Sequence, residues 1–265
     1  MANTGVMIDV SSLRHWLCDM DGVLINDGAI VPGADQFLER LRRTGRDFLV
    51  LTNNSLFTPV EVAAQLAALG LDVDVGHVWT SALATAQFVA NQRPSGTAFV
   101  IGRESVHQAL ADVGYREDHT HPDYVVLGET WDYSFDDFAT AVRAIQGGSH
   151  FVATNPEPTG PTLDGPLPGC GAMAALIESA TGTAPFFVGK PNSLMLREAM
   201  GMLNAPTHTS VMIGDRMETD VLAGVDAGLA TILVLSGANN DADASRFPFR
   251  PSRVVRSVAE LVDEL

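Results

Sequence analysis

Two aspartates one residue apart give the first sign of chemistry in this chain. Asp19 and Asp21 stand in RHWLCDMDGVLIND, directly after an apolar run and just before Gly22. Residues two apart on a strand share a face, so the two carboxylates would repel each other and lose hydration. Either the pair is solvated in an Asp-Gly turn, or a cation and a reaction require both carboxylates.

Three other apolar runs also end in residues suited to chemistry. They supply a hydroxyl with two amides, an ammonium and two further carboxylates: Thr52, Asn53, Asn54, Lys190, Asp215 and Asp220. In an open parallel sheet, ligands bind beyond the carboxyl ends of the strands. Oxygen ligands suit Mg²⁺, an ammonium neutralises phosphate oxygens, and a carboxylate can attack phosphorus. These residue types therefore predict a site that holds Mg²⁺ and a phosphoryl group.

Lys190 stands out by composition as well. It is the only lysine of the chain, because the other basic residues, 15 of 16, are arginine. An ammonium is a compact point charge, whereas a guanidinium is a planar fork, so a site that needs the former would keep its lysine. A general preference for arginine in this chain is the alternative explanation.

The elements that must position these residues alternate along the chain. Apolar runs that predict strands cover residues 15–19, 47–53, 97–102, 124–128, 150–155, 185–189, 210–215 and 230–237. Amphipathic stretches that predict helices cover residues 34–45, 58–70, 134–148 and 192–203. Such alternation is typical of α/β proteins, in which helices cover both faces of a parallel sheet. A Pro- and Gly-rich stretch at 155–169 is long for a loop and indicates a functional segment or a domain crossing.

Composition narrows the classes of partner. A formal net charge of −16 disfavours nucleic acid and anionic membrane surfaces, and it is compatible with a hard cation. Cys18 and Cys170 are the only cysteines, so no disulfide framework is expected. The N-terminal stretch lacks the pattern of a signal peptide, and no apolar run reaches the roughly 18 residues of a membrane span. We expect a cytoplasmic protein.

One short motif points elsewhere but only weakly. GCGAMA at residues 169–174 has the spacing of a dinucleotide-binding fingerprint. The fingerprint requires a preceding strand, and here a Pro- and Gly-rich stretch precedes it. A helix start or an anion-binding turn is the expected structure.

Four motifs in one order give a specific resemblance. DMDGVL, TNN, GKP and GDRMETD resemble the four motifs of the haloacid dehalogenase-like (HAD) phosphatase superfamily. The sequence is more specifically similar to the NagD-like, 4-nitrophenylphosphatase-type branch, as shown by the segments TNNS, ATNPE, PGCGA and GDRMETDVLAGVDAGLATILVLSG. The stretch ATNPE departs from the family-like ATNPD by carrying Glu157.

The resemblance implies a fold and a division into domains. It implies a Rossmann-like, parallel-sheet HAD core formed by residues 1–82 and 185–265. Residues 83–184 would form an inserted α/β cap of the C2 type, which determines substrate specificity in this branch.

The resemblance also assigns roles to individual residues. Asp19 matches the nucleophile and a metal ligand, and Asp21 matches the general acid and base, with its main-chain carbonyl on the metal. Asp215 matches the acidic metal ligand, and Asp220 matches a residue that supports the metal ligands from outside. The remaining matches hold the phosphoryl group, with Lys190 also steadying the nucleophile: Thr52, Asn53, Asn54 and Lys190.

The expected activity is Mg²⁺-dependent hydrolysis of small-molecule phosphate monoesters through a phosphoaspartate on Asp19. Sugar phosphates, nucleoside monophosphates or similar esters are the expected substrates. Two alternatives stay open: a phosphotransferase or phosphomutase with the same aspartyl-phosphate chemistry, and a catalytically silent binding protein on the same fold. Family members often dimerise through the cap, so the resemblance adds a homodimer to the expected partners.

Overall fold

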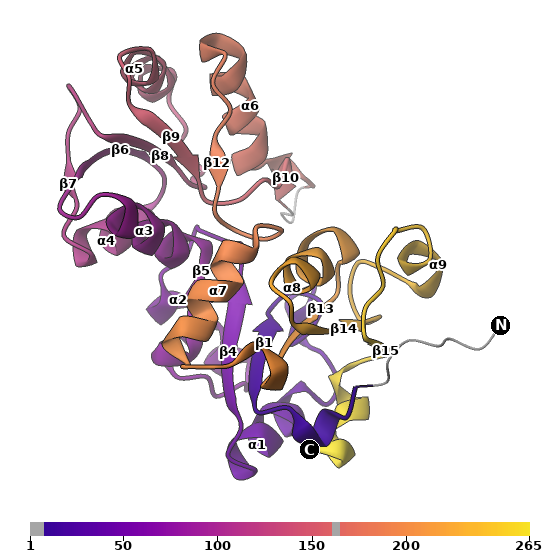
Figure 1. Ribbon diagram of the computed structural model, residues 1–265. Coiled ribbons are helices and arrows are strands. Elements are labelled where there is room, and N and C mark those ends of the chain that lie inside the picture. The colour runs from indigo at the N-terminus through magenta and orange to yellow at the C-terminus, as the bar shows by residue number, and fades with distance from the viewer. Residues whose placement is uncertain (1–7, 161–164) are drawn as a thin grey trace. The chain divides into compact units, whose positions relative to one another are not determined.

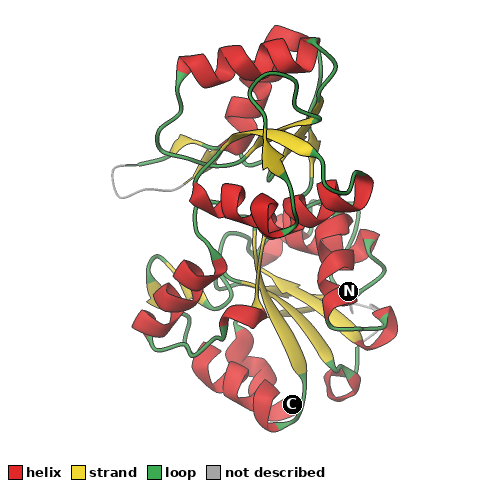
Figure 2. Ribbon diagram, turned by 90° about the vertical axis from the view of Figure 1, so that its left-hand side faces the viewer, coloured by secondary structure: helices red, strands yellow, loops and turns green. Residues whose placement is uncertain are grey.

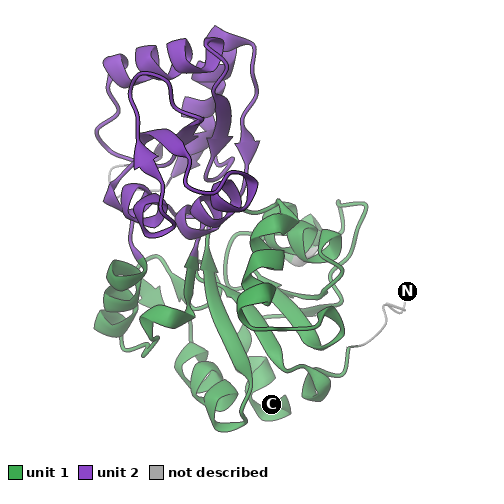
Figure 3. Cartoon of the chain, turned by 60° about the vertical axis from the view of Figure 1, so that its left-hand side comes forward, with its two compact units in different colours: residues 1–52, 59–79, 190–265 green, residues 53–58, 80–189 purple. Residues whose placement is uncertain are grey.

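The structure is a computed structural model that describes residues 8–160 and 165–265. The first seven residues of the N-terminal stretch and residues 161–164 of the Pro- and Gly-rich stretch lie outside the described residues. The chain divides into two compact units (Figure 3). Unit 1 comprises residues 1–52, 59–79 and 190–265, and unit 2 comprises residues 53–58 and 80–189.

Unit 1 is built on a six-stranded sheet with the strand order β15-β14-β13-β1-β4-β5 (Figure 1). Strand β1 lies in its middle and pairs in parallel with β4 on one side and β13 on the other. Buried apolar side chains fill these strands, as expected where helices cover both faces of a parallel sheet. The strands are β1 (His15–Asp19), β4 (Asp47–Thr52), β5 (Val78–Thr80), β13 (Ser210–Gly214), β14 (Ala230–Val234) and β15 (Arg253–Val255).

Helices lie on both sides of this sheet (Figure 2). In α1 the apolar residues recur at helical spacing, and Phe37, Leu38 and Leu41 are buried. The ring of Phe37 meets the edge of Trp16 on β1, with the ring centroids 5.4 Å apart. The α-helices of unit 1 are α1 (Ala34–Arg43), α2 (Pro59–Leu69), α7 (Ser193–Met202), α8 (Leu222–Asp226) and α9 (Asp241–Ala244).

Short elements complete unit 1. A π-helical turn, η4 (Met217–Val221), precedes α8, and a small antiparallel hairpin follows β1. The hairpin strands and the 3₁₀ turns are β2 (Ile25–Asn26), β3 (Ala29–Ile30), η1 (Val10–Ser12), η2 (Val75–His77), η3 (Thr207–Thr209) and η5 (Val258–Glu264).

Unit 2 has its own parallel sheet, with the order β12-β9-β8-β6-β7. From β6 the chain moves outward to β7, and from β8 it moves the opposite way to β9 and β12. Since such crossovers are right-handed, α4 and α5 belong on opposite faces, as Figure 1 shows. The strands are β6 (Thr97–Ile101), β7 (Arg116–Glu117), β8 (Tyr124–Leu127), β9 (His150–Ala153) and β12 (Phe186–Phe187), and the helices are α3 (Ser81–Gln92), α4 (Glu104–Asp112), α5 (Phe135–Gln146) and α6 (Cys170–Thr181).

The core of unit 2 explains which face each helix covers. Alternate residues of β6, β8 and β9 pack with the buried faces of α5 and α6 in one apolar cluster. Gly169 is the N-cap of α6, so GCGAMA begins a helix. A two-stranded antiparallel hairpin, β10 (Thr159–Gly160) and β11 (Leu167–Pro168), precedes that helix.

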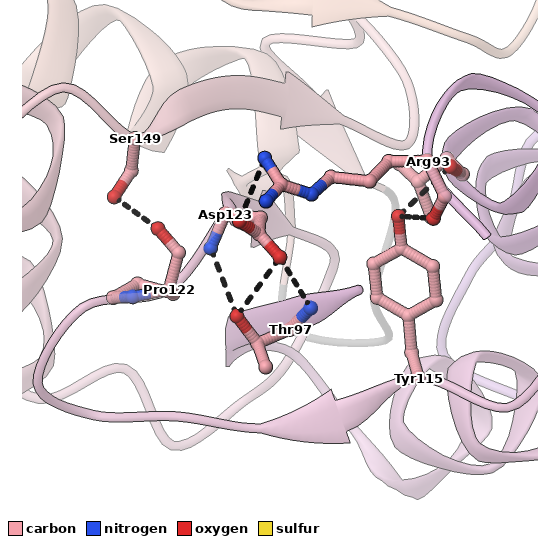
Figure 4. Close-up of polar contacts among 7 residues, drawn as sticks. Arg93, Thr97, Tyr115, Pro122, Asp123 and Ser149 are labelled. Atoms are coloured by element: carbon pink, nitrogen blue, oxygen red, sulfur yellow. Dashed lines mark hydrogen bonds and ion pairs between the residues drawn. The ribbon is translucent and has the colours of Figure 1, made fainter. Parts of the chain in front are cut away.

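The amino ends of the unit 2 strands carry a separate polar group (Figure 4). Asp123 accepts hydrogen bonds from the main-chain N–H of Thr97 at 2.9 Å and pairs with Arg93 at 3.0 Å. The hydroxyl of Tyr115 donates to the main-chain oxygen of Arg93 at 2.7 Å. Arg93 is the C-cap of α3, where a cation complements the negative end of the helix. These contacts are therefore explained by their role in the fold and do not require a functional site.

The structure refines the sequence-based boundaries. The expected strands all form, but several end one or more residues early; β14, for example, ends at Val234 and the expected strand ran to residue 237. The expected strands and helices did not include the short strands β5, β7 and β15 or the helices α3, α4 and α6. The chain crosses between the units at residues 52–53, 58–59, 79–80 and 189–190, whereas the resemblance implied crossings at 82–83 and 184–185 only. Within residues 8–160 and 165–265, no helix is both long enough and apolar enough to cross a membrane.

Candidate active site

The register of the unit 1 sheet brings the first and last motifs together. Asp19, the last residue of β1, pairs with Leu51 on β4, one residue before Thr52. On the other side Cys18 pairs with Ile213, two residues before Asp215. Because β1 lies between these two strands, its carboxyl end is flanked by theirs. Three motifs that are far apart in the sequence thus end at one edge of the sheet.

Lys190 joins this edge from the segment that leads into α7. Its ammonium contacts Asp19 Oδ1 at 2.6 Å and Asp220 Oδ1 at 2.7 Å. The lysine is 3 % exposed and Asp220 is completely buried. Burial alone would lower the pKa of Lys190, but the two carboxylates raise it above its usual value, so the ammonium stays charged.

Asp215 is held by the loop that follows β14. Its Oδ2 accepts a hydrogen bond from the main-chain N–H of Ala238 at 2.6 Å. Gly22 and Gly237 both approach its carboxyl group so closely that an added Cβ would lie 2.4 Å and 2.1 Å from Oδ2. Gly22 also has a positive φ of 77°, which disfavours other residues. The glycine after Asp21 is therefore required for both space and backbone conformation.

Three carboxylates form a compact cluster around this lysine. One oxygen from each of Asp19, Asp215 and Asp220 lies within 4.8 Å of the other two, and all three residues are buried. With all three carboxylates ionised, their charge against the single positive charge of Lys190 would leave a buried net charge of −2. Because buried unbalanced charge is costly, this donor set fits a divalent cation that prefers oxygen ligands.

The electrostatics of the cluster show the same imbalance. Burial, followed by the charge of Asp220, raises the pKa of Asp19 well above its usual range, although Lys190 opposes the shift. Burial and Asp220 likewise raise the pKa of Asp215 to about 6, against the hydrogen bond from Ala238. Each carboxylate therefore makes the others harder to ionise unless more positive charge is supplied.

Asp21 lies beside this cluster rather than in it. Its side chain reaches the surface of the unit. Surrounding protein nevertheless desolvates the carboxyl group and raises its pKa, while Lys190 and Arg216 lower it. A carboxyl group with a raised pKa at the surface of a site can take up and release protons, which is what an acid–base residue requires.

The three polar residues at the carboxyl end of β4, Thr52, Asn53 and Asn54, are divided between the units. Thr52 ends β4 in unit 1 and is buried. Asn53 and Asn54 belong to unit 2, where the side-chain amide of Asn53 donates to Glu157 Oε1 at 2.6 Å. The side chain of Asn54 accepts from the main-chain N–H of Leu56 at 2.8 Å. The structure thus gathers Asp19, Asp215, Asp220 and Lys190 in one cluster, and it shows Asn53 and Asn54 engaged within unit 2.

The sequence reasoning missed the loop after β14. Ser236 donates from its hydroxyl to the main-chain oxygen of Gly22 at 2.6 Å, and Asn239 accepts from the main-chain N–H of Met217 at 2.6 Å. This loop therefore ties the Asp21-Gly22 turn to the start of η4. The sequence signal for this loop is the pair Ser236-Gly237 after the last apolar residues of the strand. The sequence-based strand at residues 230–237 includes this pair.

With this geometry in view, the chain can be placed among known proteins. Residues 16–116 match the family model for haloacid dehalogenase-like hydrolases, and residues 187–261 match a second, HAD-hydrolase-like model. Together these matches span both sides of the inserted segment. The chain therefore belongs to the haloacid dehalogenase-like hydrolases.

Individual relatives define the branch within this family. The chain is 49% identical over 248 residues to a dihydroxyacetone phosphatase of Corynebacterium glutamicum, covering 94% of this chain and 90% of the relative. It is 39% identical over 250 residues to the ribonucleotide monophosphatase NagD of Escherichia coli, covering 94% and 98%. The solved structure of NagD from E. coli K-12 matches with a TM-score of 0.89 at 39% identity, covering 94% of this chain and 98% of that one. The protein is a phosphatase of the NagD-like branch.

A third relative bears on the metal. A glycerol phosphate phosphatase from Mycobacterium tuberculosis, solved in complex with magnesium, matches with a TM-score of 0.90 at 33% identity. The match covers 96% of this chain and 78% of that one.

Proposed function

We propose that this protein is a Mg²⁺-dependent phosphatase that hydrolyses small-molecule phosphate monoesters through a phosphoaspartate on Asp19. The supporting observation is the buried cluster of Asp19, Asp215 and Asp220 around the ammonium of Lys190. A phosphatase of this family that carries a nucleophile, a counter-charge and a donor set for a cation at one sheet edge has the parts that this reaction needs.

Asp19 acts as the nucleophile in the first step. A carboxylate oxygen forms a bond to phosphorus in line with the leaving alcohol, whose bond to phosphorus breaks. Lys190 holds Asp19 at 2.6 Å and keeps the carboxylate oriented. The fixed ammonium also balances charge that spreads over the phosphoryl oxygens in the transition state.

Asp21 moves the protons. In the first step its carboxyl group gives a proton to the departing alcohol oxygen, and in the second it takes a proton from the attacking water. The water oxygen bonds to phosphorus as the bond to Asp19 breaks, which releases phosphate and restores the carboxylate. Burial raises the pKa of the Asp21 carboxyl group, which is the direction that proton donation requires.

The carboxylates of Asp19 and Asp215 and the main-chain carbonyl of Asp21 would hold the Mg²⁺. When bound, this ion neutralises negative charge on the phosphoryl group and on the cluster. Asp220, which bonds to Lys190 and accepts from the main-chain N–H of Arg216 at 3.1 Å, supports the site from inside. Thr52, at the end of β4, holds the phosphoryl group with its hydroxyl, beside Asn53 and Asn54.

The relatives suggest where to look for the substrate. Their names describe phosphatases of dihydroxyacetone phosphate, ribonucleotides and glycerol phosphate. We propose that this chain takes an ester of the same kind, and that unit 2 selects the alcohol part. The remaining expectations stay predictions: a cytoplasmic enzyme, no nucleic acid or membrane partner, and a homodimer through unit 2.

The test is phosphate release by the purified protein from a panel of esters, in Mg²⁺ and in EDTA. The panel contains dihydroxyacetone phosphate, glycerol phosphate, sugar phosphates, ribonucleoside monophosphates and 4-nitrophenyl phosphate. We expect metal-dependent release that disappears in Asp19→Asn. Metal-independent release would exclude the proposed cofactor. Transfer of the phosphoryl group to added alcohols without release would favour a phosphotransferase, and no turnover of any ester would favour a binding protein.

A further inference from the structure

The short segment 53–58 connects the catalytic strand β4 to helix α2, yet it is counted with unit 2. Residues 53–55 adopt no helix or strand, so their main-chain groups need partners from elsewhere. Asn53 is joined to Thr52 by a single peptide bond, so whatever holds this segment also constrains the main chain at Thr52.

Ser55 is held by Glu129, which follows β8. Glu129 Oε2 accepts from the main-chain N–H of Ser55 at 2.8 Å and from its hydroxyl at 3.2 Å. The hydroxyl of Ser55 accepts in turn from the main-chain N–H of Glu129 at 3.0 Å. The hydroxyl of Ser105, at the start of α4, donates to the main-chain oxygen of Ser55. Ser55 is completely buried, so it is fixed from both sides of its peptide unit.

Asn53 is held in the same way, by two residues that follow β9 and by Ser81 at the start of α3. Its main-chain oxygen accepts from Asn155 Nδ2 at 2.9 Å and from the hydroxyl of Ser81 at 2.6 Å. Its side-chain amide donates to Glu157 Oε1 at 2.6 Å. Glu157 is the residue at which the sequence departs from the family-like ATNPD. In this chain the longer carboxylate spans to the segment after Thr52.

Two carboxylates lose more hydration on burial than the neutral side chains that could anchor the same segment. Glu129 is partly buried, and its desolvation raises its pKa while the Ser55 N–H lowers it and the charge of Glu157 raises it further. Hydrogen bonds to charged acceptors are about twice as strong as neutral ones and fix geometry more tightly. An anchor with that cost is expected where the position of the segment matters.

We propose that Glu129 and Glu157 are positioning residues of the phosphatase site: they fix the segment 53–58 and, through it, the hydroxyl of Thr52 for the phosphoryl group. The proposal rests on the proposed function. It assigns a role to two residues outside the four sequence motifs, and it explains why Ser55 of TNNS is buried.

The experiment compares Glu129→Gln and Glu157→Gln with wild type and with Glu178→Gln, a matched exchange at an exposed position of α6. Each exchange at the anchor removes the charge at nearly constant shape. We expect kcat to fall by about 5- to 30-fold in each, because the amide oxygen of Gln still accepts a hydrogen bond but one about half as strong as that of a carboxylate. We also expect KM to change less than kcat, and the melting temperature to stay close to that of Glu178→Gln.

A double-mutant cycle with Thr52→Val separates positioning from general damage. If Glu129 acts through the Thr52 hydroxyl, Glu129→Gln should cost little once that hydroxyl is gone. Inhibition by orthovanadate, whose five-coordinate form resembles the transition state, should weaken by the same factor as kcat/KM in Glu129→Gln.

The outcomes are distinct. Activity of both variants equal to that of Glu178→Gln, beside an active wild type, would overturn the proposal. Full additivity in the cycle would also overturn it, because the loss would then not pass through Thr52. An inactive wild type would instead contradict the proposed function itself.

Discussion

The two parallel sheets of this protein differ in how the charges at the carboxyl ends of their strands are balanced. Each has polar side chains at the carboxyl ends of its strands, where open sheets bind ligands. In unit 1 these are three buried carboxylates with one ammonium, Lys190, and the negative charge exceeds the positive. In unit 2 the carboxylates of Glu129 and Glu157 accept hydrogen bonds from main-chain and amide groups of the segment 53–58.

We propose that the difference separates a reacting group, Asp19, from two anchoring groups, Glu129 and Glu157. The N–H donor of Ser55 opposes the rise in the pKa of Glu129 that burial causes, so this carboxylate holds its neighbour in place. Asp19 instead faces other carboxylates, and its pKa is raised well above its usual range by burial and by Asp220. Groups with strongly perturbed pKa values cluster at functional sites. Removing single side chains from either sheet edge tests this distinction.

The largest effect is expected from Asp19→Asn. Loss of the proposed nucleophile should reduce kcat by about four orders of magnitude or more, as removal of other enzymatic nucleophiles does. Without metal, the variant should be at least as stable as wild type, because it removes a buried charge whose ionised form is disfavoured by its surroundings. Steady-state kinetics and thermal melting in EDTA check both statements. Turnover like that of wild type would show that another residue attacks phosphorus.

A smaller loss is expected from Asp21→Asn, which removes the proton donor but leaves the cluster intact. Since general acid–base catalysis contributes typically 10²- to 10⁴-fold, kcat should fall within that range. Esters with good leaving groups, such as 4-nitrophenyl phosphate, need less help from an acid and should lose less activity than alkyl phosphates. An equal loss on both kinds of ester would contradict the assignment of Asp21 as the acid.

Lys190→Arg tests whether the single lysine is required as a lysine. A guanidinium is larger and planar, so it cannot contact Asp19 and Asp220 with the geometry of the compact ammonium. We expect kcat/KM to fall by about 10- to 100-fold, the size expected for a disturbed hydrogen bond to a charged group. The reverse exchange at an exposed position of α7, Arg197→Lys, is the control and should leave kcat/KM unchanged. Unchanged kinetics in Lys190→Arg would show that the single lysine reflects only the general preference of this chain for arginine.

Much of the unit 1 edge could be predicted from sequence because its residues directly follow apolar strands. Asp19, Thr52 and Asp215 each stand at or just after the end of a run that buries itself in the sheet. A parallel sheet brings such ends together without further information. The expected α/β fold of the family is confirmed by its structural relatives.

The contacts of unit 2 could not be predicted in the same way. Ser55 and Glu129 have their hydrogen-bond partners far away in the sequence, where no local pattern points to them. Their contact joins residues 74 apart and depends on how β8 and the segment 53–58 come together. Likewise, the contact of Asp220 with Lys190 spans 30 residues and arises from the π-helical turn η4, which no spacing in the sequence indicated.

The smallest effect on activity is expected at Glu198, a carboxylate of unit 1 outside the site. Burial alone raises its pKa to about 7, and its Oε2 is buried with no hydrogen-bond partner among the described residues. It therefore shares the raised pKa of the cluster without the neighbouring charges. Glu198→Gln should leave kcat unchanged, which would show that a raised pKa by itself does not mark a catalytic group.

The same variant should change the pH dependence of stability. Because the pKa of Glu198 is higher in the folded chain, the folded state keeps a proton that the unfolded state loses above about pH 4.5. The free energy of unfolding should therefore fall as the pH rises from about 4.5 to about 7, and Glu198→Gln should remove that fall. At pH 8 the variant should be more stable by about 1 kcal/mol, a value kept small because solvent screens a partly exposed group. Urea unfolding of wild type, Glu198→Gln and Glu178→Gln at pH 5 and pH 8 measures this. A stability gain at pH 8 in Glu178→Gln as large as in Glu198→Gln would trace the effect to net charge rather than to burial.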